Sequence, residues 1–151
     1  MRPIPHNILT PFIARWEGLK LTPYKDGGGV WTVGYGHTGP DVVPGVAWTQ
    51  EQAERALVKD LEEARQVVYA GVRPEVVNLL SDHQYAALLS FAYNTGARRG
   101  STIWKLLNAG ALDGVPRQLM RWVYDNGVIV AGLANRRRAE VQLWNTKAVV
   151  A

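Results

Sequence analysis

The sequence predicts an α+β fold, mostly helical, in which one long helix connects a small antiparallel β-hairpin lobe to a helical lobe. Three observations support this: a glycine-rich turn before an alternating strand, an apolar pattern of helical period over about twenty residues, and shorter helical segments after it. At 151 residues the chain is expected to form a single domain. The expected parts are a helix at about 10–18 packed on the helical lobe, the hairpin lobe at about 19–48, the connecting helix at about 49–70 and the helical lobe at about 72–151.

The first helix is predicted from its end signals. Thr10 suits the N-cap and Pro11 suits the first helical position, where no backbone N–H is needed. An apolar stripe follows as far as Trp16, and Gly18 is a typical stop. Glu17 is therefore expected at the C-terminal end of a short helix, where the helix dipole opposes a negative charge.

The hairpin lobe is predicted from a turn and the strand after it. Lys25-Asp26-Gly27-Gly28-Gly29 has the residue types that tight turns require, and residues 30–37 alternate like a strand. In a single strand of this length Thr32 would share one face with Gly34 and Gly36. Such a face is almost bare of side chains and suits close approach by backbone or substrate.

The later helices have clear local signals. Thr49 with Gln52, and Ser81 with Gln84, are spaced as capping boxes. The segment 85–93 is apolar on nearly every side, which is typical of a helix at the centre of a core. Further helices are expected at 74–80, at 102–108 after a Ser101 cap and at about 133–144. Pro116 opens a segment that runs through Trp122 and Tyr124, and Asn126-Gly127 is expected to form a turn.

Two carboxylates and a hydroxyl form the candidate catalytic set. Glu17, Asp26 and Thr32 lie on separate small elements that precede the long helix. Glycoside hydrolysis needs one acid to protonate the leaving oxygen and a second carboxylate across the cleft. Taken singly, each residue also fits a simpler reading, because Glu ends many surface helices, Asp-Gly forms ordinary turns and Thr is common in strands.

Other site classes find little support. The chain has no cysteine, which excludes disulfides, thiolate nucleophiles and cysteine-ligated zinc. Its three histidines are scattered and form no H-E-x-x-H pattern. The triple glycine after Asp26 precedes a strand, whereas a phosphate loop precedes a helix. No metal and no cofactor are therefore expected.

Charge and hydropathy limit the classes of partner that can be expected. The net charge of +4 favours an anionic partner without choosing among nucleic acid, acidic lipid and bacterial wall. The basic residues are spread out and no recognition motif is present, so nucleic-acid binding is not expected. The N-terminus lacks the apolar region of a signal peptide, and apolar runs such as 128–134 are too short to cross a bilayer, so no membrane insertion is expected.

Two motifs resemble one enzyme family. The spacing of Glu17, Asp26 and Thr32, with the strand TVGYGHT, resembles the phage-type lysozymes, which are endolysins of glycoside hydrolase family 24. Near the other end, GLANRRRAEVQLW (132–144) is similar to that family's closing G-L-x-x-R-R-x-x-E-x-x-L-W helix. The two motifs have the right order and overall spacing, and the resemblance covers essentially the whole chain.

The resemblance implies a lysozyme-like, two-lobed fold and cleavage of the β-1,4 bond between N-acetylmuramic acid and N-acetylglucosamine in peptidoglycan. It implies that Glu17 is the general acid, Asp26 the second carboxylate and Thr32 the residue beside the attacking water. The short Thr32 side chain would leave room for that water, which is the arrangement expected of an inverting hydrolase.

The same resemblance implies further site residues. His37 and Thr38 are expected to line the cleft, although a histidine in such a place is more often a hydrogen-bonded structural residue than a catalyst. Tyr93 and Thr102 are expected to contact sugar, with core and cap roles as their alternatives. Either Arg136 or Arg137 is expected to pack against Glu17 and hold it, unless both belong to a solvated basic patch.

Two other functions compete with the hydrolase. A lytic transglycosylase uses a single acid and no water, and Asp26 with Thr32 argues against it. A non-catalytic basic module that binds wall or membrane would not need Glu17. No separate wall-binding domain is evident in the sequence, so a thin, Gram-negative-type wall is expected as the substrate. By family analogy, the protein, expected to be a monomer, waits in the host cytoplasm until a holin opens the inner membrane.

Overall fold

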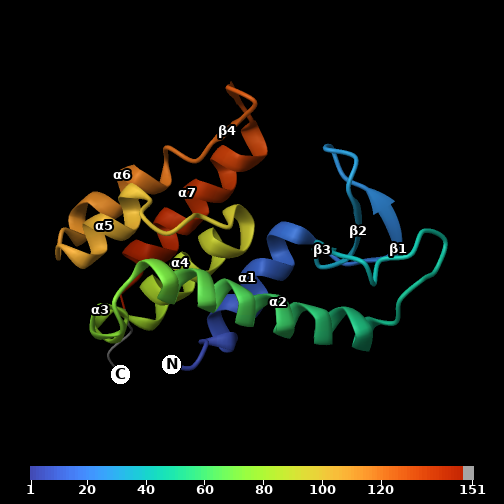
Figure 1. Ribbon diagram of the computed structural model, residues 1–151, viewed down its shortest axis with the longest axis horizontal. Helices are drawn as coiled ribbons and strands as arrows, with labels where there is room; N and C mark the ends of the chain where they lie inside the picture. Colours follow the sequence, from blue (N-terminus) through green and yellow to red (C-terminus); the bar gives the residue numbers. More distant parts are fainter. Residues whose placement is uncertain (148–151) are drawn as a thin grey trace.

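The computed structural model describes residues 1–147, and the last four residues of the expected helical lobe lie outside that range. A small β-sheet lies at one end of the molecule and most of the helices lie at the other, with one long helix running between them (Figure 1). The predicted fold class, mostly helical with small antiparallel sheets, is confirmed.

The small sheet contains three antiparallel strands in the order β1-β2-β3. These are β1 (Lys20–Lys25), β2 (Trp31–Gly34) and β3 (His37–Thr38). Tyr24 pairs with Thr32, and Val33 pairs with His37.

The expected single strand over 30–37 is wrong. The chain turns at Tyr35-Gly36, where Gly34 (φ +69°) and Gly36 (φ +78°) both have left-handed backbone angles. Glycine adopts such angles at little steric cost, so the chain reverses and His37 begins the next strand.

The connecting helix is α2 (Gln50–Gly71), and it begins with the predicted capping box between Thr49 and Gln52. Its buried residues recur at helical spacing, so one stripe packs on the core while the opposite face meets solvent. In Figure 1 this helix runs from the small sheet into the helical lobe.

The centre of the helical lobe is α4 (Asp82–Thr95), whose capping box of Ser81 and Gln84 was also predicted. It is buried over most of its length, and α1, α2 and α7 pack against it. The remaining elements are α3 (Pro74–Leu79), α5 (Thr102–Asn108), a 3₁₀ turn (Leu112–Gly114), α6 (Val115–Leu119), β4 (Tyr124–Asp125), β5 (Val128–Ile129) and α7 (Ala131–Asn145).

The first helix differs from the prediction. α1 (His6–Glu17) begins after Pro5, five residues before the predicted N-cap at Thr10, and Pro11 lies inside it. Leu9 and Ile13, one turn apart, are both fully buried in the core. We attribute the longer helix to this packing, which outweighs the hydrogen bond that Pro11 cannot make.

Two expectations near the later turns also change. Ser101 does not cap α5 with its side chain, because its hydroxyl donates to the carbonyl of Arg98 at 2.6 Å. The Asn126-Gly127 turn joins β4 to β5, a second small hairpin where only a turn was predicted.

The fold leads to a stability prediction at Gly71. A Cβ there would lie 2.5 Å from two atoms of the buried Trp104 ring, so Gly71→Ala must displace the indole. We expect a loss of about 1–3 kcal/mol in the free energy of unfolding, measured by chemical denaturation. Gly132→Ala is the matched control, because it adds a methyl group to another helical glycine with open space around it, and it should not destabilise. Equal effects of the two substitutions would contradict this packing.

Candidate active site

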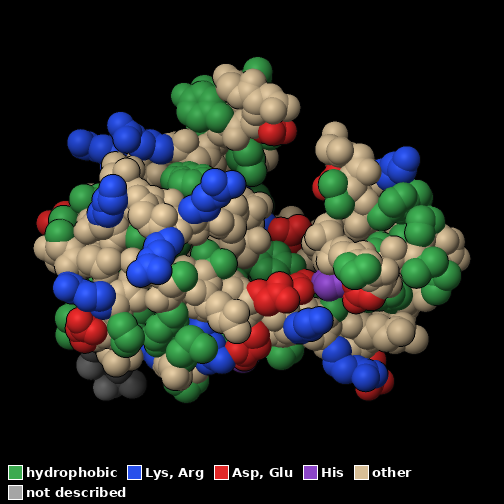
Figure 2. Space-filling view, in the orientation of Figure 1, with side chains coloured by type: hydrophobic (Ala, Val, Ile, Leu, Met, Phe, Trp, Pro, Cys, Tyr) green, Lys and Arg blue, Asp and Glu red, His purple; other side chains and the backbone are tan. Residues whose placement is uncertain are grey.

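A cleft of about 470 Å³ lies between the small sheet and the helical lobe. Its walls include Glu17 from the end of α1, Asp26 and Thr38 from the sheet region, and Tyr93 and Asn94 from α4. In the space-filling view, acidic side chains gather at the base of the gap between the two lobes (Figure 2). The cleft thus brings together carboxylates that are separated in the sequence.

Glu17 is the last residue of α1, and its side chain is 22% exposed. Gly18 follows with φ +67° and ends the helix there. The Arg136 guanidinium of α7 donates a hydrogen bond to Glu17 Oε1. On the other side lies the backbone of Gly36, where a Cβ would come within 2.5 Å of Oε2. The carboxyl is therefore held between an arginine and a bare piece of backbone.

Asp26 and Thr32 are tied to each other through Val30. The amides of Gly28 and Val30 both donate to Asp26 Oδ1 at 2.9 Å, as in a typical Asx turn. The Thr32 hydroxyl donates to the Val30 carbonyl at 3.0 Å and its side chain is buried. Both bonds to Asp26 end on Oδ1, which leaves Oδ2 available to water or substrate.

Tyr93 joins the two lobes. Its ring lines the cleft, and its hydroxyl donates to the carbonyl of Tyr35, in the turn between β2 and β3, at 2.6 Å. Burial raises the pKa of Tyr93, with the charge of Glu17 adding to the effect, so the phenol stays a donor. The side chain expected to contact sugar therefore also braces the turn that carries Gly36.

His37 does not line the cleft as expected. It is buried, with Nδ1 2.6 Å from Asp60 Oδ2 and Nε2 2.8 Å from Asp41 Oδ1. Both ring nitrogens face carboxylates, so both act as donors, as they do in the imidazolium. This environment fits the alternative reading of His37 as a structural residue that ties β3 to α2.

Two further expectations need correction. Thr102 is exposed at the start of α5 and is not among the residues that form the cleft. Arg137 does not reach Glu17: it lies 2.7 Å from the Glu140 carboxylate and donates to Asn94 at 2.7 Å. Sequence reasoning left open which arginine holds Glu17, and the structure shows that it is Arg136.

Some cleft residues were missed. Asp60, Glu63, Ala64 and Val67 line it from α2, and none of them was predicted as a site residue. Their spacing of i, i+3, i+4 and i+7 places them on one helical face, and that pattern was a usable signal. Asn94, at the C-terminal end of α4, had no signal of its own.

Within residues 1–147, no three histidine, cysteine or acidic side chains come together as a metal site would require. The same range contains no helix both long and apolar enough to span a membrane.

Comparison with known proteins decides the family. The family model described as phage lysozyme matches residues 14–140, which includes the whole cleft. This chain belongs to the phage lysozyme family. As a member of this family, it is a glycoside hydrolase that acts on peptidoglycan.

Relatives and solved structures agree with this family. The chain is 41% identical to the SAR-endolysin of Bacteriophage PS119 over 133 residues, which is 85% of this chain and 77% of that protein. It superimposes on the muramidase domain of SpmX from Asticaccaulis excentricus with a TM-score of 0.82 at 27% identity, covering 97% of this chain and 100% of that one. For the endolysin from Escherichia coli O157:H7 phage FAHEc1 the TM-score is 0.79 at 32% identity, with 95% and 94% covered.

A substitution at Gly36 tests the wall of the cleft. Gly36→Ala puts a methyl group where Glu17 Oε2 lies and strains a residue at φ +78°. Because the carboxyl must move, we expect activity on peptidoglycan to fall by about 10²-fold in a turbidity assay of purified walls. Gly127→Ala is the matched control, with the same φ and open space, and should cost stability alone. Similar activities for the two variants would show that Gly36 does not position Glu17.

The contacts of His37 with Asp60 and Asp41 predict that the stability of the fold depends on pH. Burial disfavours the charged ring, but the hydrogen bonds and charges of Asp60 and Asp41 outweigh it and raise the pKa of His37. The resulting stabilisation is complete below the unfolded-state pKa of about 6.5 and is lost as pH rises through the higher folded-state pKa.

His37→Gln should therefore lower the free energy of unfolding by about 1.5 kcal/mol near pH 5.5, and by less as the pH is raised. Urea unfolding at several pH values measures this. His83→Gln controls for loss of an imidazole elsewhere, in α4. A difference for His37→Gln that grows with pH would contradict the assigned contacts.

Proposed function

We propose that this phage lysozyme cleaves the β-1,4 bond between N-acetylmuramic acid and N-acetylglucosamine, with inversion at the anomeric carbon. Glu17 is the general acid, Asp26 the second carboxylate, and Thr32 helps to place the water. The observation that carries the proposal is that Glu17 and Asp26 reach one cleft from separate elements, α1 and the turn after β1. Two carboxyl groups facing a glycan-sized groove are what glycoside hydrolysis requires.

The chemistry assigns one step to each group. Glu17 gives its proton to the glycosidic oxygen as the bond from that oxygen to C1 breaks. Positive charge develops at the sugar ring, and ionised Asp26 stabilises it. A water held by Asp26 Oδ2 and the Thr32 hydroxyl oxygen attacks C1 from the opposite face and loses its proton to Asp26. The product then carries the inverted configuration.

The neighbouring groups support these roles. The two backbone amides on Asp26 Oδ1 stabilise its carboxylate and fix its orientation. Arg136 and the Gly36 backbone restrict Glu17 to one place in the cleft. Thr38, Tyr93 and Asn94 add hydroxyl, aromatic and amide surface along the walls, which suits a glycan strand.

The transglycosylase alternative is less well supported. That reaction needs one acid and closes the sugar on its own hydroxyl without water, so it has no use for a second carboxylate. Here Asp26 is held by two backbone bonds at the edge of the cleft. A purely binding module is also disfavoured, because binding alone would not require an arginine-held carboxyl in a cleft.

The decisive test is Glu17→Gln on chemically defined peptidoglycan. We expect wild type to release reducing N-acetylmuramic ends, detected by mass spectrometry, and the variant to release at least 10³-fold fewer, since the amide cannot donate the proton. Wall binding by the variant, measured by co-sedimentation, should be retained.

Other outcomes would point elsewhere. Anhydro-muramic ends from wild type would move the protein to the transglycosylases. Undiminished cleavage by Glu17→Gln would remove Glu17 from the acid role. The first product anomer, followed by NMR in the same digest, should be α, and a β product would contradict inversion.

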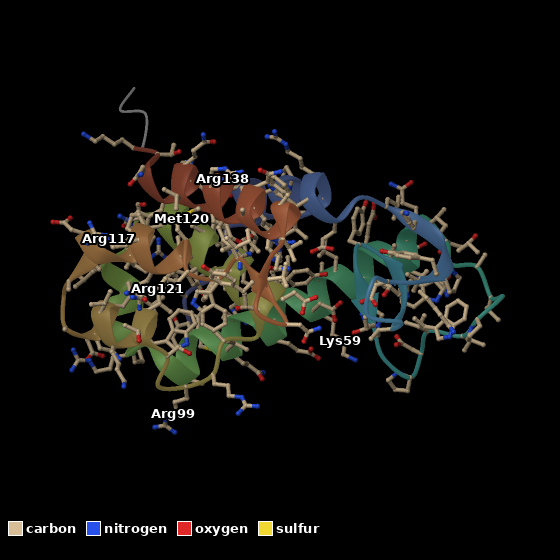
Figure 3. The ribbon with its side chains drawn as sticks, turned by 90° about the horizontal axis from the view of Figure 1, so that it is seen from above. Lys59, Arg99, Arg117, Met120, Arg121 and Arg138 are labelled. Atoms are coloured by element: carbon tan, nitrogen blue, oxygen red, sulfur yellow. The ribbon has the colours of Figure 1, made fainter. Side chains whose placement is uncertain are left out.

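Site of action and partners follow the same proposal. Arg99, Arg117 and Arg138 lie at separate places around the helical lobe rather than along one groove, which supports the prediction that nucleic acid is not a partner (Figure 3). Release from the host cytoplasm by a holin and a monomeric state also stay predictions. Lysis timed with and without a co-expressed holin tests the first, and sedimentation velocity tests the second.

A further inference from the structure

A buried carboxylate that takes no part in the proposed reaction lies behind the cleft. Glu140 of α7 is completely buried. Its Oε2 accepts a hydrogen bond from the Ser90 hydroxyl of α4 at 2.6 Å and another from Arg137 Nη2 at 3.1 Å. Its Oε1 lies 2.7 Å from Arg137 Nε. An anion removed from water in this way is costly unless its partners are well placed.

The two arginines beside Glu140 lead to the cleft. Arg136 Nε lies 3.6 Å from Glu140 Oε2, and the other end of the same guanidinium donates to Glu17. Arg137 stacks over the Phe91 ring at 5.3 Å and donates to Asn94 Oδ1 at 2.7 Å. One buried carboxylate thus contacts two guanidiniums, and each of these contacts a residue of the cleft wall.

We propose that Glu140 is a positioning residue for the reaction, acting through Arg136 on the Glu17 carboxyl. The proposal rests on the proposed role of Glu17 as the acid. Glu140 and Ser90 fix the guanidinium of Arg136 from behind, where Nη2 also reaches the Ser90 carbonyl at 3.4 Å. These contacts limit the positions from which Arg136 can reach Glu17.

Charge balance gives Glu140 a second effect on Glu17. Arg136 and Arg137 carry two positive charges, and Glu17 and Glu140 carry two negative charges when both are ionised. Without the charge of Glu140, Glu17 would be the only carboxylate set against two guanidiniums. A surplus of positive charge beside a carboxyl group favours its ionised form, which is the wrong state for a proton donor.

Stability alone is a weak explanation for this cluster. Replacing buried ion pairs with apolar residues is often neutral or stabilising, so their value commonly lies in fixing one arrangement. Here the chain of contacts leads from Glu140 through Arg136 to Glu17 in the cleft. The titratable and charged groups that face Glu17 come from every surrounding element: Arg136 from α7, Tyr93 from α4, Asp60 and Glu63 from α2, and Tyr24 and Asp26 from the sheet region.

The test is Glu140→Gln, which keeps the shape of the side chain and removes its charge. We expect kcat on peptidoglycan to fall about 10²-fold with little change in KM. The alkaline limb of the pH–activity profile should move to lower pH by about one unit, because surplus positive charge beside a general acid favours its ionised form. A residue that only supports folding would lower activity without moving that limb.

Matched variants separate position from charge. Glu140→Gln with Arg137→Gln restores the balance of one positive and one negative charge, so the alkaline limb should return toward its wild-type place. Glu140→Asp keeps the charge and should recover part of kcat. Leu107→Ala, a buried change in α5, provides a destabilised reference that should leave the profile unmoved.

If Glu140→Gln fails to fold, Ser90→Ala carries the test, because it removes one hydrogen bond from Glu140 and keeps every charge. A several-fold loss of kcat is then expected. A wild-type pH profile for Glu140→Gln, or wild-type kcat for Ser90→Ala, would overturn the proposal. Glu17→Gln measured alongside separates the proposed function from the positioning role of Glu140. If Glu17→Gln is inactive while the Glu140 variant behaves as wild type, the proposed function stands and the positioning role fails.

Discussion

The contact between Arg136 and Glu17 is the interaction on which the cleft depends. It joins the end of α1 to α7 through two residues that lie 119 positions apart in the chain. The carboxyl that projects into the cleft has no other side-chain partner within residues 1–147 that fixes it, and the Gly36 backbone closes its remaining side. The proposed acid therefore depends on the packing of both helices against α4.

A few long-range hydrogen bonds hold the small sheet against the helices. Tyr93 bonds the Tyr35 carbonyl, and His37 bonds Asp60 of α2. Both contacts end near the turn between β2 and β3, where Gly36 meets Glu17. These contacts thus meet at the turn beside the proposed acid, so Tyr35 and His37 shape the site although neither lines the cleft.

Charge is distributed unevenly between the cleft and the surface. The cleft wall collects carboxylates from α1, α2 and the sheet region, whereas basic side chains are spread over the surface of the helical lobe (Figure 2). The net charge of +4 therefore conceals a negative groove on a basic body. That division is compatible with an enzyme that approaches an anionic wall and cleaves it at a site needing two carboxyl groups.

The sequence by itself determined the fold class, both capping boxes, the Asn126-Gly127 turn and the candidate carboxylates. The capping boxes and the turn are local: a cap involves residues three apart, and a turn is set by two or three φ angles. Only the tertiary structure decided the start of α1, the place of His37 behind the cleft, the choice of Arg136 over Arg137, and the inclusion of Asp60, Glu63 and Asn94 in the wall. These depend on which helix faces meet, and packing between distant segments selects among alternatives that are equal in local sequence.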